Sequence, residues 1–366
     1  MLIKIEMTYR LLLFLINIIC ISNLDNNRQI VKDNIATMKI KILYVLTSTD
    51  KDIYMEQLWV SVTSLRMYNP ETMVVLLMDK ITYEGLIGYR AKLLDLIDES
   101  IVVPTPEGYS QKEMSRYIKT TARQWVKGDF LFIDTDTVIA GDLSDVDKLE
   151  GDVLLCPEFH ESLKNNPMGT SLINRVKQIF NTDISNAPNY YNSGIILCRD
   201  TEFAHKFYKQ WNENWTQSLK CKNVNFDQPA LAKTDHDLGY AVKELDGQYH
   251  CQIFLSIKYL YRAKIIHFFN MTWFKDAAIS PFLTKELYLN VKNKGFIDDE
   301  TLFLIKDVKN QFPAVSVTVC RKEFDLLVDY GKSLMTIMVN PDTKLKKFCK
   351  FMIEKAIRIY WIFQRF

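Results

Sequence analysis

Two acidic residues close an apolar run near the middle of the chain, in FLFIDTDTVIAGDL at 130–143. Asp134 and Asp136 are separated by one residue, so on an extended segment both carboxylates project to the same side while Thr135 faces away. Burying an ionised carboxylate without a partner is costly, so such groups find a cation or change protonation state. Two oxygen donors at a strand's carboxyl end suit Mg²⁺ or Mn²⁺, whose other positions are commonly filled by phosphate oxygens and water. The pair predicts a metal-bound diphosphate.

Other chemistries fit the acidic pair less well. A calcium loop is excluded because Val138 stands where a ligand is needed and no glycine follows it. A phosphatase of the haloacid dehalogenase type matches D-x-D-x-[TV], with Asp134 as nucleophile and Asp136 as general acid. Its motif normally closes the first strand, whereas at least two predicted strands precede this one, and Asp298-Asp299 is typical of a helix cap. The chain has no G-x-G-x-x-G, G-x-x-x-x-G-K or G-x-S-x-G motif.

Composition indicates a large globular protein. The 366 residues are 48% hydrophobic, and the net charge of +2 supports no prediction of nucleic-acid binding. Seven widely spaced cysteines without a C-x-x-C pair argue against a disulfide framework or a structural zinc site, and Cys156 and Cys198 are predicted core residues. The predicted location is therefore a reducing one, the cytoplasm.

The first half of the chain alternates strands with helices. Strands are predicted at 38–50, 73–80 and 100–106, with helices at 53–68, capped by Asp52, and at 83–96. This alternation predicts an α/β domain with a mostly parallel sheet, in which ligands bind beyond the carboxyl ends of the strands.

A basic helix leads directly into the acidic motif. Ser110 and Glu113 form a capping box at its start. Arg116, Lys119 and Arg123 recur at helical spacing opposite the apolar face, so they form either a solvated stripe or part of the site.

The second half adds further candidates and the domain boundaries. Strands are predicted at 152–159 and 190–200, a helix at 201–215 and a strand from Ala263 that reaches His267. Asp235-His236-Asp237 is predicted to be an exposed polar loop. The predicted division is a leader or signal/anchor segment at 1–37, with an apolar stretch at Leu11–Ser22, a catalytic domain at 38–280 and a mainly helical region at 281–366.

Four motifs in order resemble those of the GT-A glycosyltransferases, and among them the family 8 type. The motifs are FLFIDTDTVI, YNSGIIL with Asn192, FDQPAL with Asp227 and Gln228, and IIHFF with His267. The resemblance covers residues 38–273. It implies a GT-A fold, Rossmann-like with flanking helices, and metal-dependent transfer of a sugar from a nucleotide-diphosphate sugar to an acceptor hydroxyl, with retention.

The resemblance also implies a role for each matching residue. The metal, Mn²⁺ or Mg²⁺, would be bound by Asp134, Asp136 and His267, and the donor sugar would lie beside Asn192, Asp227 and Gln228. The base and ribose would contact Thr47, Ser48, Thr49 and Asp79, while Arg116 or Lys119 would face the donor. The family usually follows the histidine with a glycine and Lys-Pro-Trp, which are absent here. Trp273 or Lys275 would replace part of their function, with Lys275 meeting the diphosphate.

Three of these assignments also have a structural interpretation. His267 could be a satisfied histidine at a strand end, residues 192–194 an ordinary turn, and Asp227 a helix N-cap. A non-catalytic sugar-binding or scaffold protein with the same fold is the alternative of a different class.

The C-terminal segment KLKKFCKFMIEKAIRIYWIFQRF at 344–366 predicts a basic amphipathic helix. It places Leu345, Phe348 and Met352 on one face and Lys347 and Lys350 on another. Such a helix is typical of an in-plane membrane anchor, and the alternative is a helix packed on the core. An anchor would favour a glycan or lipid-linked glycan as acceptor and a role in surface glycan synthesis, with the protein peripheral on the membrane.

Overall fold

The computed structural model describes residues 38–253, 255–256, 258–269, 280–311 and 344–363, with side chains of the last helix described to Lys355. The segment 1–37 with its apolar stretch, and Trp273 and Lys275, lie outside the described residues. The predicted domain boundaries stay a prediction. No helix among the described residues is long and apolar enough to cross a membrane.

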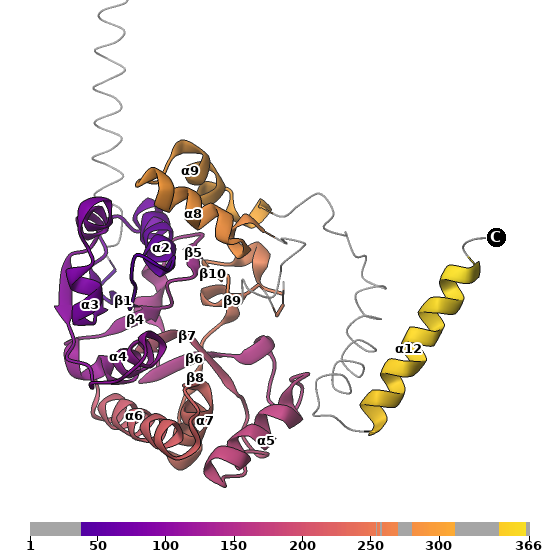
Figure 1. Ribbon diagram of the computed structural model, residues 1–366. Coiled ribbons are helices and arrows are strands. Elements are labelled where there is room, and N and C mark those ends of the chain that lie inside the picture. Colours follow the sequence, from indigo (N-terminus) through magenta and orange to yellow (C-terminus); the bar gives the residue numbers. More distant parts are fainter. Residues whose placement is uncertain (1–37, 254, 257, 270–279, 312–343, 364–366) are drawn as a thin grey trace, which may run out of the picture. The chain divides into compact units, whose positions relative to one another are not determined.

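A seven-stranded sheet forms the centre of the fold (Figure 1). Its strand order is β3-β2-β1-β4-β7-β6-β8, and only β7 runs antiparallel to its neighbours. The predicted α/β class with a mostly parallel sheet is therefore confirmed. The strands are β1 (Lys41–Leu46), β2 (Val74–Met78), β3 (Glu99–Val102), β4 (Phe130–Ile133), β6 (Val153–Pro157), β7 (Tyr191–Cys198) and β8 (Lys243–Glu244).

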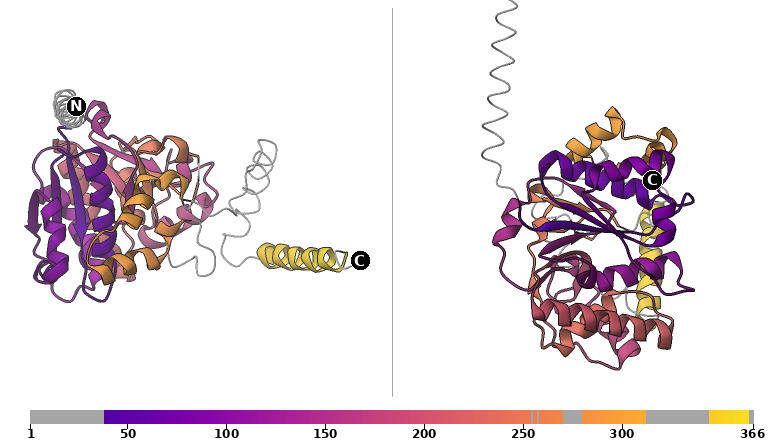
Figure 2. Two further views of the ribbon diagram at one scale, coloured as in Figure 1. Left: turned by 90° about the horizontal axis from the view of Figure 1, so that it is seen from above. Right: turned by 90° about the vertical axis from the view of Figure 1, so that its left-hand side faces the viewer.

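Helices cover both faces of this sheet, as the right-hand view of Figure 2 shows. Tyr44 of β1 faces α2, where its hydroxyl lies 3.0 Å from Ser61 Oγ. Alternate strand residues such as Leu43 and Phe132 face the opposite way and join a core with α4, α6 and α7. The α-helices of the described residues, whether or not they lie on this sheet, are α2 (Tyr54–Tyr68), α3 (Lys80–Glu84), α4 (Gln111–Trp125), α5 (Gly169–Phe180), α6 (Glu202–Lys222), α7 (Gln228–Asp237), α8 (Lys285–Lys294), α9 (Asp299–Lys306) and α12 (Lys344–Phe363).

A second, three-stranded sheet places His267 next to the acidic motif. Its order is β5 (Thr137–Ile139), β10 (Ile265–His267) and β9 (Cys251–Gln252). β5 and β10 are antiparallel, and their register pairs Thr137 with His267. Because β5 begins directly after Asp136, this register brings His267 beside the acidic pair. α2 supports β5 through Ser64 Oγ, which accepts the Ile139 N–H at 2.8 Å.

The predicted helical stretch at 83–96 is confirmed only in part, because it is not one continuous α-helix. α3 ends at Glu84, and a 3₁₀ helix occupies Gly88–Leu96 after a break at which Gly88 has φ +58°. A left-handed residue ends the regular helical path, and glycine adopts it without steric penalty.

Two further local predictions need correction. Asp52 does not occupy the N-cap of α2, which is Ile53, although its Oδ1 accepts the Tyr54 N–H at 3.0 Å. Asp235 lies in the last turns of α7 rather than in an exposed loop. It is 3% exposed, its carboxylate accepts the Val242 N–H at 3.0 Å, and burial raises its pKa to about 6.

Residues 281–311 are mainly helical and pack onto the preceding fold. The rings of Phe268 and Phe282 have centroids 5.1 Å apart. Lys292 Nζ, on α8, donates to the backbone carbonyls of Asp50 and Asp52, the latter at 2.8 Å. α8 therefore braces the turn between β1 and α2, which borders the site described next.

Candidate active site

Asp134, Asp136 and His267 form a cluster that could hold a metal ion. One ligand atom from each of the three lies within 4.8 Å of the other two. His267 Nε2 is 2.9 Å from Asp136 Oδ1 and 3.9 Å from Asp134 Oδ2. Two carboxylates and one imidazole suit a divalent cation, and the nitrogen ligand favours Mn²⁺ over Mg²⁺. The donor set therefore fits the predicted metal.

Backbone hydrogen bonds hold these side chains in place. The Asp134 N–H donates to the Gly194 carbonyl of β7, and the Phe268 N–H donates to the Asp136 carbonyl, both at 2.8 Å. The acidic motif is thus tied to the large sheet on one side and to the small sheet on the other. Thr135, which was predicted to face away, instead lines the same cavity as its two neighbours.

The three groups influence each other's protonation. Burial raises the pKa of Asp134. Burial would also raise the pKa of Asp136, but the charge and hydrogen bond of His267 outweigh it and lower that pKa. Burial acts to lower the pKa of His267, and Asp136 overcomes it, so that this pKa is raised. Among these three residues, the His267 imidazole is the group that offsets the negative charge of Asp136.

Gly194 gives the His267 ring its space. A Cβ at position 194 would lie 2.3 Å from His267 Cε1 and 2.7 Å from its Nδ1, too close for any side chain. Residues 192–194 belong to strand β7 and do not form the ordinary turn that was the alternative. Glycine stands in this motif because an imidazole lies directly against its backbone.

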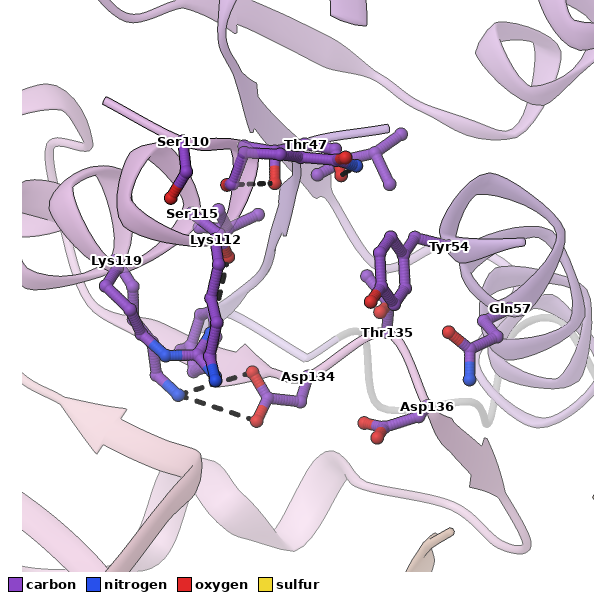
Figure 3. Close-up of a pocket in the computed structure, with 15 residues that line it drawn as sticks. Thr47, Tyr54, Gln57, Ser110, Lys112, Ser115, Lys119, Asp134, Thr135 and Asp136 are labelled. Atoms are coloured by element: carbon purple, nitrogen blue, oxygen red, sulfur yellow. Dashed lines mark hydrogen bonds and ion pairs between the residues drawn. The ribbon is translucent and has the colours of Figure 1, made fainter. Parts of the chain in front are cut away.

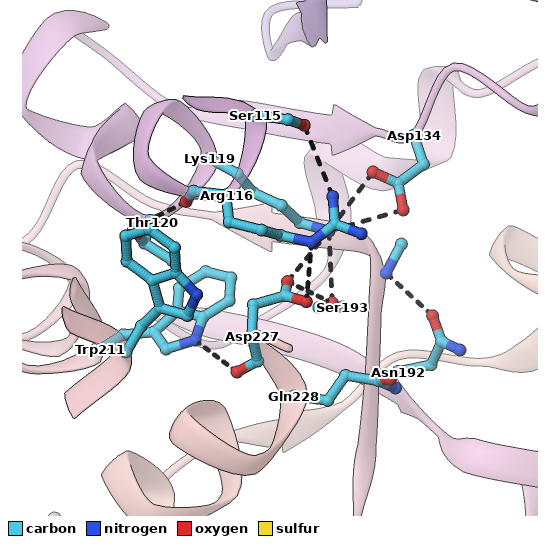
Figure 4. A network of polar contacts seen from close by, with 12 residues as sticks. Ser115, Arg116, Lys119, Thr120, Asp134, Asn192, Ser193, Trp211, Asp227 and Gln228 are labelled. Carbon is cyan, nitrogen blue, oxygen red and sulfur yellow. Dashed lines mark hydrogen bonds and ion pairs between the residues drawn. The ribbon is translucent and has the colours of Figure 1, made fainter. Parts of the chain in front are cut away.

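The buried ammonium group of Lys119 connects the candidate metal site to Asp227 and Ser193 (Figure 4). Lys119 Nζ on α4 lies 3.3 Å from Asp134 Oδ1, 3.4 Å from Asp227 Oδ2 and 3.2 Å from Ser193 Oγ. Its side chain is 3% exposed, and Arg116 Nε lies 3.3 Å from Asp227 Oδ1. The basic stripe is therefore not a solvated face.

Arg123, the third member of that stripe, serves the core instead. It is 2% exposed, and its guanidinium lies over the Phe130 ring, 4.8 Å from the centroid, and 3.5 Å from Asp200. Its role is to pack α4 against β4.

Asp227 precedes α7 at the N-cap position, but its side chain makes no capping hydrogen bond. The carboxylate turns toward Lys119 and Arg116 and accepts the Ser193 hydroxyl at 2.8 Å. Burial alone would raise its pKa, but the two cations outweigh burial and lower the pKa to about 2. Asp227 is thus an anion at neutral pH, placed by the helix start and held by charge.

Glu158 belongs to the site although no motif pointed to it. Its Oε2 accepts from Asn192 Nδ2 at 2.8 Å and from Gln228 Nε2 at 3.0 Å, and burial raises the pKa of its carboxyl. These bonds turn the amide nitrogens of two predicted site residues toward Glu158, which leaves Asn192 Oδ1 to accept the Gly194 N–H at 2.9 Å. Glu158 directly follows a buried strand, as Asp134 does, and this position in the sequence is the signal that could have identified it.

Backbone strain accompanies the placement of Glu158. The next two residues, Phe159 and His160, have φ of 63° and 56°, in the left-handed region that costs non-glycine residues about 1–3 kcal/mol each. Gln252 holds this turn: its Oε1 accepts the Phe159 N–H and its Nε2 donates to the Pro157 carbonyl, both at 3.0 Å.

A cavity of about 430 Å³ opens beside Asp134 and Asp136 of the candidate metal site (Figure 3). The acidic motif lies at one side and the start of α4 at another, with Thr47 and Tyr54 on the β1–α2 side. Polar side chains predominate among its lining residues, which are Val45, Leu46, Thr47, Tyr54, Gln57, Ser110, Gln111, Lys112, Ser115, Arg116, Lys119, Phe132, Asp134, Thr135 and Asp136.

Thr47 lines this cavity, whereas Ser48, Thr49 and Asp79 are not among its lining residues. Ser48 Oγ and the Thr49 N–H both donate to Asp52, at 2.7 and 2.8 Å. Asp79 is 1% exposed and accepts from the Ile81 and Thr82 N–H groups. Thr82 Oγ1 in turn accepts the Ser48 N–H at 2.8 Å. Asp79 therefore reaches the turn through Thr82, and contact of these residues with a nucleotide stays a prediction.

We expect Gly194→Ala to weaken Mn²⁺ binding about 10-fold or more, because the new methyl group must displace the His267 ring. Titration of Mn²⁺, followed through the electron paramagnetic resonance of the free ion, measures this. Gly141→Ala is the matched control, since its Cβ would meet no atom closer than 3.7 Å. Equal affinities in the two variants would contradict the role assigned to Gly194.

We expect Asp227→Asn to lower the free energy of unfolding by about 2 kcal/mol at pH 7. The folded-state pKa of about 2 lies below that of an unfolded aspartate, so this stabilisation is present above about pH 4 and is lost as pH falls toward 2. Urea unfolding between pH 7 and 3 measures it, with exposed Asp50→Asn as control. A stability difference that does not shrink toward acid pH would argue against a charge-held Asp227.

The chain is similar to known proteins in structure only. No family model matches the chain, and no curated protein matches it. The glycosyltransferase GlyE of Streptococcus pneumoniae TIGR4 has 14% identity over 79% of this chain and 71% of its own, with a TM-score of 0.44. The galactosyltransferase LgtC, solved with donor and acceptor sugar analogs, has 13% identity over 71% of this chain and 98% of its own, with a TM-score of 0.46.

Mouse xyloside xylosyltransferase 1 has 12% identity over 62% of this chain and 97% of its own, with a TM-score of 0.42. Because all three TM-scores lie below 0.5, the case for a function rests on the residues of the site. The chain is similar in structure to solved glycosyltransferases, the class of enzyme whose motifs its sequence resembles.

Proposed function

We propose that the protein is a metal-dependent glycosyltransferase with a GT-A catalytic domain, which moves a sugar from a nucleotide-diphosphate sugar to an acceptor hydroxyl. The observation that carries this proposal is the cluster of Asp134, Asp136 and His267 at the edge of a polar cavity, beside the buried Lys119. The cavity volume of about 430 Å³ falls in the range typical of small-molecule sites.

The charges of the site match those of glycosyl transfer. The departing nucleoside diphosphate gains negative charge, which a divalent cation held by the Asp134, Asp136 and His267 side chains would stabilise. The anomeric carbon becomes electron-poor, and the ionised Asp227 would lie near it together with Gln228. Lys119 keeps Asp134 and Asp227 at a set spacing, and Arg116 lines the cavity where the donor would bind.

The amide groups near the sugar would be oriented before the donor binds. Glu158 accepts hydrogen bonds from Gln228 Nε2 and Asn192 Nδ2. The side-chain carbonyl of Gln228 is therefore the group left to face the donor. Preorganised dipoles of this kind act without reorganising during the reaction. Retention of the anomeric configuration is proposed from the family resemblance.

Two alternatives make different predictions. A phosphatase using Asp134 as nucleophile would form an aspartyl-phosphate. Its motif normally closes the first strand, yet three of the described strands precede β4, and Asp298 caps α9 by accepting the Thr301 N–H at 2.9 Å. A scaffold protein with this fold would bind neither metal nor nucleotide sugar.

We expect Mn²⁺-dependent hydrolysis of at least one nucleotide sugar, chosen by thermal-shift screening with and without Mn²⁺. Asp136→Ala and His267→Ala should each reduce this hydrolysis about 100-fold or more, because each removes a predicted metal ligand. Release of the nucleoside diphosphate measures it.

His236→Ala, in the last turn of α7, is the control and should retain wild-type activity. Wild-type protein that neither shifts with any nucleotide sugar nor hydrolyses one would refute the proposal, and a covalent phosphate on Asp134 would establish the phosphatase.

We infer that α12 attaches the protein to anionic membranes, where a lipid-linked glycan would be the acceptor. Leu345, Phe348 and Met352 share one face and are 57%, 60% and 50% exposed. Lys347 and Lys350 lie on the opposite face and are also exposed. An apolar face with flanking lysines is suited to lie in the interface of an anionic bilayer.

Deletion of residues 344–366 should abolish co-sedimentation with vesicles that contain phosphatidylglycerol, while hydrolysis of the nucleotide sugar persists. Vesicles of phosphatidylcholine alone are the control and should bind the full chain weakly, because the lysines then lack anionic partners. Unchanged sedimentation of the shortened chain would refute the anchor.

A further inference from the structure

We propose that His250 is a positioning residue for the metal site, which sets the ring orientation and the proton position of His267. The inference deepens the proposed function, because it concerns the imidazole assigned there as a ligand. His250 belongs to none of the four motifs, and its neighbours in GQYHCQIF give no sign of a metal site.

The two histidines contact each other directly in the interior. His250 Nε2 lies 2.9 Å from His267 Nδ1, and the ring centroids are 5.1 Å apart. His250 is 0% exposed and His267 3% exposed, so no bulk water competes for this hydrogen bond. The opposite nitrogen, His267 Nε2, faces Asp136. Each ring nitrogen of His267 therefore has its own partner.

The proton position follows from this arrangement. A metal ligand uses the lone pair of a neutral imidazole nitrogen, so His267 can offer Nε2 only when its proton is on Nδ1. That proton then needs an acceptor, and His250 Nε2 is the atom within reach. A ligating histidine usually donates its second N–H to a carboxylate, a backbone carbonyl or water. Here a neutral imidazole takes that place.

Packing restricts the orientation of the His267 ring. Gly194 lies against one edge, where even a methyl group would overlap the ring. The Phe269 ring centroid lies 4.7 Å from that of His267. Since both nitrogens have fixed partners and these contacts restrict rotation, loss of the His250 acceptor would leave a buried N–H unsatisfied, at a cost of about 1–3 kcal/mol.

His250 is itself held from two directions. The backbone N–H of His250 donates to the Gly247 carbonyl at 3.2 Å, in a 3₁₀ turn that Asp246 caps. Its carbonyl lies 2.9 Å from Nε2 of His160, which belongs to the strained turn after β6. The turn that follows Glu158 thus also contacts the backbone of His250.

The test compares two substitutions that differ in whether they keep an acceptor. His250→Gln can place its side-chain carbonyl near the former Nε2, whereas His250→Met has similar length and no comparable acceptor. Mn²⁺ alone is titrated into the full chain, and the free ion is followed by electron paramagnetic resonance. We expect the Kd to rise about 10–100-fold in His250→Met and to stay within about 3-fold of wild type in His250→Gln.

Thermal unfolding by circular dichroism shows that each variant is folded, and His236→Met is the control, expected to match wild type. Equal weakening in the Gln and Met variants would overturn the inference, and so would an unchanged Kd in His250→Met. If His250→Met does not fold, His250→Gln decides alone: a Kd near wild type supports the inference and a 10-fold rise overturns it.

The titration also separates this inference from the proposed function. Wild-type protein that binds no Mn²⁺ overturns the inference. Protein that binds Mn²⁺ with the expected dependence on His250 but neither hydrolyses nor transfers any sugar overturns the function and leaves the role of His250 standing.

Discussion

The site depends on one buried ammonium group that lies between carboxylates from different parts of the chain. Lys119 is within 3.4 Å of both Asp134 and Asp227, and it is almost completely shielded from solvent. A buried charge of this kind is tolerated only when it is paired and hydrogen-bonded, and removal of one partner is strongly destabilising. The spacing between Asp134, in the candidate metal site, and Asp227 is thus set by electrostatics as well as by the backbone.

The two sheets explain how these groups meet. β4 carries the acidic motif out of the large sheet, and β5 continues directly into the small one, where β10 returns with His267. Strand β7 runs antiparallel beside β4 and supplies Ser193 and Gly194 at the same edge. The candidate metal site therefore lies where the chain passes from one sheet to the other.

Several residues serve the site from behind it. Glu158 orients two amides, His250 contacts His267, and Asp79 reaches the β1–α2 turn through Thr82. All three are wholly or partly buried polar groups, and burial strengthens their hydrogen bonds while making each unmatched partner costly. Such supporting groups restrict the rotamers of the residues that would touch a ligand.

The sequence by itself determined the α/β class, the start of α4, and the residue types of the four motifs. These depend on local physics: the strand period of two, the helical period, and the capping box formed by Ser110 and Glu113. Local signals failed within the predicted helix 83–96, where a left-handed Gly88 interrupts the α-helical path, and at Asp235, whose carboxylate accepts the N–H of Val242 beyond the helix.

Only the tertiary structure decided which polar groups meet. The sequence could not show that Lys119 is buried against Asp134 and Ser193, because these residues are 15 and 74 positions away from it. Nor could it show that Glu158 joins Asn192 and Gln228, 34 and 70 residues away, or that His250 lies behind His267, 17 residues away. Residue spacing along one strand or helix fixes the direction of a side chain. Strand order and the packing of separate elements fix what that side chain contacts, and no local pattern encodes them.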